Sequence, residues 1–341
     1  MRHAQIVFEL ATPAFVSTAD QNAAELGPQT IKGLLRWWWR ALPENANLTV
    51  DKLKEEEASI FGFAAKEIRV RSNVAVTLKC ERSTFRDQGQ RPYASGLKVK
   101  SGKFEVDALE YLAYGPVATV SRKEKDNDGR AYNPKFNDEQ TGRAKTGLLL
   151  KRPALEPGSR FVLGLSWRSG SLGKKQEQGL VRAVAAWLEL GGIGSRSRKG
   201  WGSVCFRARE MPDELTKVFD EARRELRAMD TQPTAAVSPT PWPSLASFRL
   251  IGKVTGSDWK ETLGRLGEKY KALKPSSRSD ERWIAGSAAP RRASSIILKV
   301  RPQESESQII EGVLGVFICN SSETSKGQKE WNCFFQSLRW V

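Results

Sequence analysis

Alternation of hydrophobic and polar positions predicts several strands. The clearest examples are residues 67–79 and 160–167, "EIRVRSNVAVTLK" and "RFVLGLSW". In both, apolar side chains recur at every second position, which predicts strands with one buried face. Two shorter strands are predicted at residues 5–10 and 203–209. The apolar positions of the two longer strands are Ile68, Val70, Val74, Val76 and Leu78, then Phe161, Leu163, Leu165 and Trp167.

A period of 3.6 residues predicts helices over residues 29–42 and 177–190. Gly191 and Gly192 end the second of these. In chain order the elements run strand, helix, strand, strand, helix, strand. This is the βαββαβ order of a ferredoxin-like (RRM-like) domain, whose helices cover one face of an antiparallel sheet. The fold class expected is therefore α+β.

Composition and charge divide the chain further. A polar, charged insertion at about residues 80–146 lies between the second and third strands and is too long for a simple turn. We interpret it as a projecting loop or a small subdomain, either a binding arm or a solvated excursion. We expect a first domain over residues 1–230, including a helix at 212–229, and a Pro-rich linker over 231–246.

A second domain is expected over residues 247–341. It begins like the first, with a strand at 247–254, a helix at 258–273, and strands at 294–300 and 312–319. Its final helix and strand are poorly defined by the pattern. The prediction is therefore two ferredoxin-like domains, the first with a long insertion.

The net charge of the chain indicates what kind of partner its surface suits. Lys and Arg number 55 against 39 Asp and Glu, giving +16, a balance that favours a polyanionic partner such as nucleic acid. The alternative is a basic surface with no partner. No apolar run approaches the ~20 residues that a membrane span needs, and no signal peptide is evident, so we expect a cytoplasmic protein without membrane contact.

Metal and nucleophile chemistry has few candidates. His3 is the single histidine and lies near the chain start, which argues against catalytic triads and histidine-bound zinc. The cysteines form no C-x-x-C pair, so buried reduced thiols are expected in place of zinc sites or disulfides. We expect no cofactor and no metal. The cysteines are Cys80, Cys205, Cys319 and Cys333.

A tryptophan-rich helix, "PQTIKGLLRWWWRAL" at residues 28–42, carries an apolar stripe suited to a core. Opposite that stripe, Lys32, Arg36 and Arg40 stand four residues apart. Gly33 lies beside this row and lets another backbone approach closely. The row predicts either phosphate contact or a solvated helix face.

A glycine-rich loop, "GGIGSRSRKGWGSV" at residues 191–204, follows the second helix. It is not a nucleotide fingerprint, because it runs from helix into strand and lacks the third glycine and the G-K-[ST] motif. Its glycines predict an anion nest of backbone N–H groups, with Trp201 as a base-stacking surface. The alternative is a flexible connection. The cations of the loop are Arg196, Arg198 and Lys199.

Together the helix and the loop resemble the two signature motifs of the RAMP superfamily of CRISPR effector proteins. The tryptophan-rich helix and "PRRASSIILKV" at residues 290–300 are most similar to the first subunit of the type III-B Cmr complex. The resemblance implies a non-catalytic, RNA-binding subunit that acts in antiviral defence. It would contact the 3′ part of the crRNA, the target RNA and other Cmr subunits.

The resemblance also implies RNA-binding residues. Lys32, Gly33 and Arg36 fall on the helix motif, and Arg291 and Arg292 in the C-terminal basic segment. Our prediction adds Arg40, Ser195 and Trp201 to these. The positions on the loop motif are Gly192, Gly194, Arg196, Arg198, Lys199, Gly200 and Gly202.

An alternative function is a metal-dependent endoribonuclease. The segment "TPAFVSTAD" places Asp20 in the loop after the first strand, where related backbone subunits carry an aspartate that supports RNA cleavage. One carboxylate without a visible partner is weak support, because divalent-metal catalysis recruits further oxygen ligands. A loop or capping role is the other interpretation of Asp20.

Overall fold

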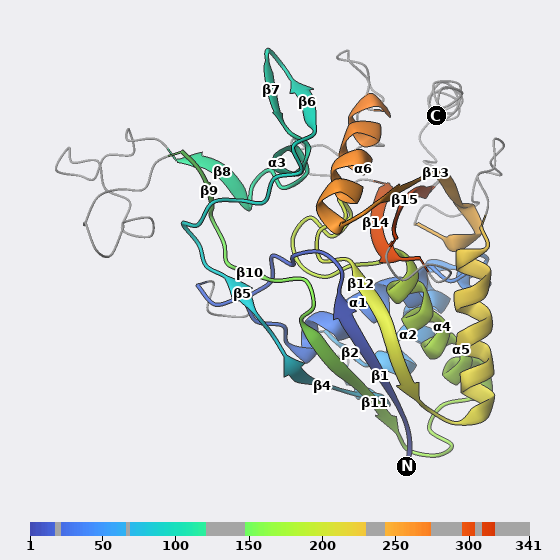
Figure 1. Ribbon diagram of the computed structural model, residues 1–341. Helices are drawn as coiled ribbons and strands as arrows, with labels where there is room; N and C mark the ends of the chain where they lie inside the picture. Colours follow the sequence, from blue (N-terminus) through green and yellow to red (C-terminus); the bar gives the residue numbers. More distant parts are fainter. Residues whose placement is uncertain are drawn as a thin grey trace.

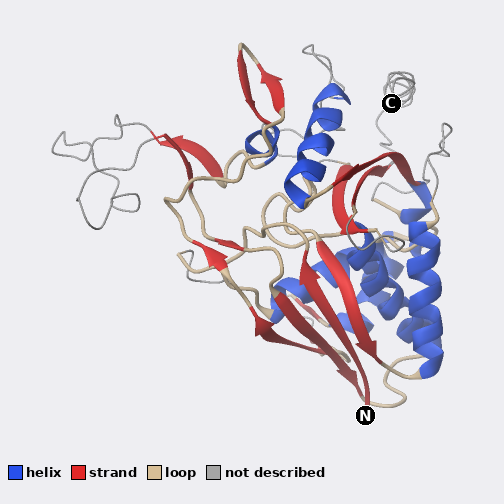
Figure 2. Ribbon diagram, in the orientation of Figure 1, coloured by secondary structure: helices blue, strands red, loops and turns tan. Residues whose placement is uncertain are grey.

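The computed structural model has a mixed α+β architecture with antiparallel sheets (Figures 1 and 2). It describes residues 1–17, 22–65, 69–120, 147–229, 243–273, 295–303 and 309–317. Two sheets organise these residues. Among them, no helix is long and apolar enough to cross a membrane.

The first sheet holds β1 (Arg2–Leu10), β4 (Ala75–Arg82), β11 (Arg160–Trp167) and β12 (Val204–Glu210). Its order is β12-β1-β11-β4, and every neighbouring pair is antiparallel. The predicted alternation appears directly in β11, where every second side chain is buried. Phe8 lies opposite Phe161 in the register, and their rings stack with centroids 5.5 Å apart.

The long strand predicted over residues 67–79 is interrupted. Its regular part, β4, starts only at Ala75, while β3 (Arg69–Val70) pairs separately with β2 (Phe63–Ala64). The reason is Ser72, whose hydroxyl donates to the carbonyl of Val74 at 2.7 Å and so competes with a strand ladder. Val70 is consequently 41% exposed.

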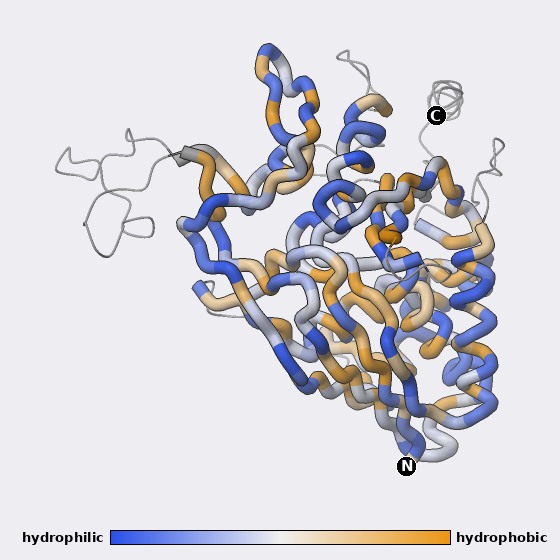
Figure 3. The backbone as a smooth tube through the Cα atoms, viewed as in Figure 1, coloured by the Kyte–Doolittle hydropathy of each residue, from blue (hydrophilic) through white to orange (hydrophobic). Residues whose placement is uncertain are grey.

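Helices α1 (Pro28–Arg40), α2 (Val50–Phe61) and α4 (Lys174–Leu190) lie behind the first sheet in Figure 1. The short 3-10 helix η1 (Pro43–Asn45) follows α1. Helix α5 (Asp213–Arg227) packs on α4, and hydrophobic residues recur among hydrophilic ones along its length (Figure 3), as in an amphipathic helix. Trp187 of α4 meets Phe8 edge-on with centroids 5.0 Å apart, at the centre of the first core.

Sequence periodicity did not predict α2. Its segment, "VDKLKEEEASIF", is dominated by charge, and local signals start the helix instead. Thr49 caps the N-terminus by accepting the Lys52 N–H at 3.3 Å, and Asp51 adds a negative charge in the first turn. This helix matters for the site because it brings a buried glutamate, Glu57, next to α1.

The second sheet contains β13 (Phe248–Gly256), β14 (Ile296–Pro302) and β15 (Ile310–Phe317), in the order β13-β15-β14. Helix α6 (Trp259–Leu273) packs on all three strands, and a 3-10 turn (Leu245–Ser247) leads into β13. These elements agree with the predicted strand, helix, strand, strand series. The helix and strand expected after them lie outside the described residues.

The described residues of the insertion form small hairpins around α3 (Ala108–Leu112). Helix α3 packs on α6 beside the second sheet (Figure 1), where a Cβ added at Gly267 would lie 3.1 Å from that of Ala108. Leu109 and Leu112 therefore share a core with α6. The strands of this region are β5 (Phe85–Arg86), β6 (Lys98–Ser101), β7 (Phe104–Asp107), β8 (Val117–Val120), β9 (Gly147–Leu150) and β10 (Ala154–Leu155).

Candidate nucleic-acid interface

The tryptophan-rich helix and the glycine-rich loop meet in space, although about 150 residues separate them in the chain. They enclose a hollow of about 280 Å³. The second sheet closes it with Ile297 of β14. The remaining lining residues are Gly33, Leu34, Trp37, Trp38, Leu190, Gly191, Gly192, Ser197 and Arg198.

Backbone hydrogen bonds hold the glycine-rich loop in a fixed shape. The N–H of Ser195 donates to Phe15 O at 2.8 Å, and that of Gly202 donates to Pro13 O at 2.8 Å. The N–H groups of Ile193, Lys199 and Gly200 donate to carbonyls within the loop. These five groups are used inside the protein, so the predicted anion nest is wrong for them, and anion binding has to come chiefly from side chains.

Two glycines are required by this folded loop. Gly202 has φ +63°, and a Cβ there would lie 2.0 Å from the carbonyl oxygen of Ile193. At Gly194, with φ +77°, a Cβ would lie 2.4 Å from Phe15 O. Both contacts are with backbone, which cannot move aside cheaply. The loop thus has a structural need for glycine that is separate from any ligand.

The prediction that Trp201 offers a base-stacking surface is wrong. The residue is 1% exposed and packs against Phe15, Tyr93 and Trp259, with ring centroids 5.1, 5.6 and 6.1 Å away. These aromatic residues come from four distant parts of the chain. Burial of an indole of this size anchors the loop to the second core and leaves no face for a base.

Strand β14 fixes the far side of the loop. The Leu298 N–H donates to Arg198 O at 3.1 Å, and the Val300 N–H to Ser203 Oγ at 3.1 Å. Between them the side chain of Lys299, fully buried, donates to Gly191 O at 2.5 Å and Val204 O at 2.6 Å. The Lys299 Nζ thus ties both ends of the loop to the second sheet. The sequence pattern does not indicate this role, because Lys299 is a single cation within an apolar strand.

A buried ion-pair cluster lies next to this lysine. Glu189, whose side chain is 1% exposed, is paired by Arg223 at 2.6 Å, Arg227 at 2.8 Å and Arg301 at 3.0 Å. Burial alone would raise the pKa of Glu189, but the three guanidinium groups lower it overall. The cluster joins α4, α5 and β14, and it helps hold the two sheets together.

The three loop cations differ in their surroundings. Arg196 is exposed and has a positive φ of 63°, whereas Arg198 and Lys199 are half-buried. The Arg198 guanidinium lies 5.2 Å from the centroid of the Trp37 ring, at the hollow. The Lys199 ammonium lies 3.6 Å from the Tyr270 ring centroid, a cation–π contact that favours its placement. Arg198 is therefore the loop cation that lies at the hollow, whereas the exposed Arg196 lies outside its lining, on the side of Gly115.

The basic row on α1 is partly neutralised. Glu57, only 8% exposed in its side chain, accepts from Arg36 Nε at 2.5 Å and lies 3.3 Å from Arg40 Nε. Lys32 is half-buried, and its pKa is lowered by burial and by the nearby charge of Arg36. Lys32 and Arg36 remain beside the exposed Gly33, but Arg40 and Arg36 share one carboxylate. Their phosphate contact stays a prediction.

Several predicted positions fall elsewhere. Asp20, Arg291 and Arg292 lie outside the described residues, as do Cys319 and Cys333. Within the described ranges, Cys205 is buried, Cys80 and His3 are exposed, and no group of three or more His, Cys, Asp and Glu side chains could hold a metal ion. No observation on the described residues supports the endoribonuclease alternative.

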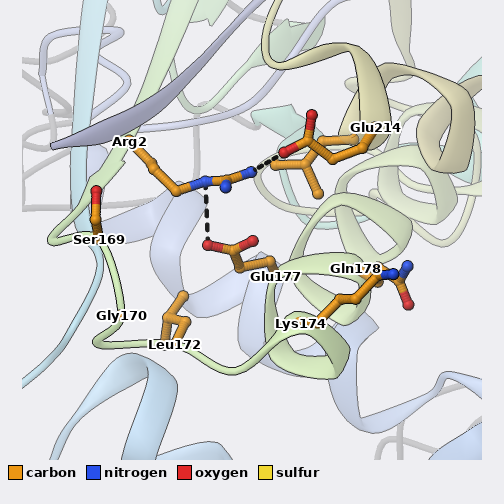
Figure 4. A pocket seen from close by; sticks show the side chains of 9 residues that line it. Arg2, Ser169, Gly170, Leu172, Lys174, Glu177, Gln178 and Glu214 are labelled. Carbon is orange, nitrogen blue, oxygen red and sulfur yellow. Dashed lines mark hydrogen bonds and ion pairs between the residues drawn. The ribbon is translucent and has the colours of Figure 1, made fainter.

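A larger hollow of about 410 Å³ lies at the opposite end of the first sheet. In Figure 4, Arg2 reaches between Glu177 and Glu214 and forms ion pairs with both. Glu177 also accepts from Trp167 Nε1 at 2.7 Å. Together with Lys174, which also lines the hollow, Arg2 balances the two glutamates, and the ion pairs serve the packing of β1 against α4 and α5, so this hollow is not our candidate interface.

These features define an α+β protein in which a glycine-rich loop, clamped between two antiparallel sheets, presents arginines beside a tryptophan-rich helix. The chain belongs to the RAMP superfamily, whose sequence pattern matches residues 7–205, more than half of its length. The resemblance inferred from the two motifs is thereby confirmed.

Known proteins of this kind are similar to the chain over most of its length. CRISPR system Cmr subunit Cmr1-2 of Pyrococcus furiosus is 25% identical over 197 residues, which cover 58% of this chain and 90% of the relative. The crystal structure of Cmr1 from Pyrococcus furiosus, in its apo form, matches 94% of this chain and 89% of its own, with TM-score 0.50 and 18% identity.

A chain in the cryo-EM structure of the type III-B Cmr-beta bound to cognate target RNA has the same fold. The match covers 99% of this chain and 99% of that chain, with a TM-score of 0.55 and 11% sequence identity. At 11% identity the match supports the similarity of fold alone. The fold therefore extends over the second sheet as well as the part that matches the family pattern.

Proposed function

We propose that this chain is an RNA-binding subunit of a type III-B CRISPR interference complex. In that role it contacts the 3′ part of the crRNA and the target RNA, and it works beside other Cmr subunits without cutting RNA itself. The observation that carries the proposal is the hollow where Arg198 and Gly33 face one another across the two family motifs. The similarity to Cmr1-2 supports the assignment to this complex.

The chemistry of the hollow suits a sugar-phosphate backbone better than a base. Arg198 at the hollow, and Arg196 on the adjoining exposed part of the loop, supply guanidinium groups suited to pair with phosphate oxygens in two-pronged geometry. Gly33 leaves open space on α1, because a Cβ there would meet no atom within 4 Å. A backbone with regular charge and no fixed sequence fits such a surface, and base pairing with a guide supplies the sequence information.

We also propose that both sheets belong to ferredoxin-like domains. The first sheet has the order β12-β1-β11-β4. Numbered along the βαββαβ unit, these are its fourth, first, third and second strands. In the second, β13, β15 and β14 supply the first, third and second strands. The division at residues 230 and 247 and the role of the insertion remain part of this proposal.

Binding of isolated protein to single-stranded RNA is expected to weaken steeply with salt. Charged side chains dominate the proposed contacts, and log K falls by ~0.7 per unit of log salt for each phosphate neutralised on a single strand. Fluorescence anisotropy with labelled oligouridine at several KCl concentrations measures the slope. A flat response would contradict the proposed phosphate contacts.

Gly33→Ala separates stability from binding. Alanine in a helix interior is more stable than glycine by ~0.5–1 kcal/mol, and the space at Gly33 is open, so the melting temperature is expected to rise slightly. If RNA backbone approaches α1 at this point, the added methyl group weakens RNA binding in the same variant. Thermal unfolding and anisotropy are measured together, and unchanged RNA affinity would remove Gly33 from the interface.

A further inference from the structure

The open face of the first sheet carries a second basic cluster, on the side away from α1 and α4. Glu9 of β1 is 8% exposed and accepts hydrogen bonds from arginines of the other three strands of the sheet. The distances are 3.3 Å to Arg82 Nη2, 3.1 Å to Arg160 Nη2 and 2.9 Å to Arg207 Nη2. We call these four residues the Glu9 cluster.

The charges of the Glu9 cluster do not cancel. Burial alone would raise the pKa of Glu9, but hydrogen bonds and charge from Arg207 and Arg160 lower it overall, so the carboxyl is ionised. Three cations around one anion leave an excess of two positive charges. The side chains of Arg82, Arg160 and Arg207 are 64%, 36% and 39% exposed, so this excess faces solvent.

Most of the donors in the cluster are not used by Glu9. A guanidinium has five N–H groups in a planar fork. Arg207 donates one of these to Glu9, while Arg82 donates one to Glu9 and its Nε to Gly158 O at 3.0 Å. Glu9 thus orients the guanidinium groups at the sheet surface, as a preorganised anion site requires.

The Glu9 cluster adjoins the glycine-rich loop. It lies at the end of β1 where Ala11 N–H donates to Ser203 O at 2.8 Å, directly after the loop. Glu9 is opposite Cys205 at the start of β12, and the Cys205 thiol contacts Glu9 O at 3.3 Å. A chain of phosphates leaving the loop therefore meets the cluster within the first residues of β12.

The face around the cluster favours phosphate over bases. RRM-type sheets bind single-stranded RNA by stacking bases on exposed aromatic side chains of their strands. Here the outward positions of β1 and β11 next to the cluster are Val7 and Val162, followed by Gln5 and Gly164. These residues give a flat surface without an aromatic platform, beside a fixed excess of positive charge.

We propose that Arg82, Arg160 and Arg207, oriented by Glu9, form a second phosphate-binding site on the open sheet face. It receives the backbone of the same single-stranded RNA after it passes the glycine-rich loop. The inference rests on the proposed RNA-binding function and extends the interface from the hollow to the opposite layer of the first domain.

The experiment compares two changes of opposite sign in the full-length protein. Arg82→Gln with Arg207→Gln is expected to weaken oligouridine binding at low salt by about tenfold per arginine and to reduce the salt slope by ~0.7 for each phosphate that is no longer neutralised. Glu9→Gln keeps a side-chain oxygen that accepts hydrogen bonds from the arginines but removes the negative charge of the cluster, so it is expected to tighten binding. Arg168→Gln, exposed at the other end of β11, is the control and leaves both quantities unchanged.

A purely structural cluster gives another result. Glu9→Gln then lowers the melting temperature without tightening RNA binding, and the double arginine variant keeps the wild-type salt slope, which overturns the proposal. A photo-crosslinking amino acid at the exposed Gln5 supplies a second readout and is expected to label oligouridine. Absence of labelling from Gln5, while a probe at Ser197 in the hollow does label, rejects the open-face site alone. Absence of labelling from both positions rejects the RNA-binding function itself.

Discussion

Reversing the charges of Arg196 and Arg198 to glutamate is expected to weaken single-stranded RNA binding by about 100-fold or more. Each guanidinium bond to a charged oxygen contributes ~1.5–3 kcal/mol, so loss of two such bonds already accounts for this factor before any repulsion is added. The decrease should be the same for all sequences, and the salt slope should shrink.

The fold is expected to survive this double change. Arg196 is exposed, and Arg198 is half-buried beside the solvent-accessible hollow, whereas the hydrogen bonds that shape the loop come from backbone groups and from Ser203. Lys199 is left unchanged, because its ammonium lies over the Tyr270 ring and its residue pairs with Leu298 of β14. Substituting it would confuse binding with stability.

A matched control separates local contact from net charge. Lys174→Glu with Lys175→Glu makes the same change in net charge at the exposed N-terminus of α4, while the loop follows the C-terminus of that helix. Anisotropy titrations and thermal unfolding compare the wild type with both double variants. Equal losses of affinity in the two would show that the effect is a long-range charge effect and would contradict the assignment of the loop.

Local pattern was sufficient to predict most of the helices and strands that carry the site. The helix over residues 177–190 and the strand over 203–209 correspond to α4 and β12, and the glycine-rich loop lies between them as expected. Period and glycine position determine these elements through neighbours in the chain, so the sequence alone is informative. Their meeting with α1 is a tertiary contact that the sequence pattern did not predict.

The partners of the site residues could not be predicted in the same way. Glu57 pairs with Arg36 and Arg40 only because α2 folds beside α1, and nothing in the tryptophan-rich segment indicates that carboxylate. The glycines and cations around Trp201 in the sequence predict an exposed aromatic side chain. In the fold, three aromatic residues from distant segments bury it. Such contacts depend on tertiary packing, which overrides what local composition suggests.

Burial of Lys299 is expected to make the stability of the fold depend on pH. It is fully buried, and desolvation lowers its pKa from the ordinary value of 10.5 to about 7, although Glu189 acts in the opposite direction. Between these two pH values the unfolded chain holds a proton that the folded chain lacks. The free energy of unfolding therefore rises with pH through this window, by up to ~1.4 kcal/mol per pH unit.

Lys299→Met removes this pH dependence. Below pH 7 the lysine is protonated in both states and adds no slope, so the window of interest lies above it. Urea unfolding at pH 7.5, 8.5 and 9.5 is expected to show the wild type gaining ~2–3 kcal/mol relative to the variant. Groups away from Lys299 titrate in both proteins and cancel in the comparison, whereas the Cys205 thiol interacts with Lys299, so both proteins carry Cys205→Ala.

The variant also tests how the loop is held. Methionine cannot donate to Gly191 O or Val204 O, so both ends of the loop lose a hydrogen bond at every pH, which lowers stability by a constant amount. The neutral amine of wild-type Lys299 still has two N–H groups and keeps both bonds above pH 7, so its loop stays clamped where its stability increases. If the unfolding curves of wild type and variant stay parallel from pH 7.5 to 9.5, Lys299 keeps its proton throughout, and the clamp is a buried cation balanced by Glu189.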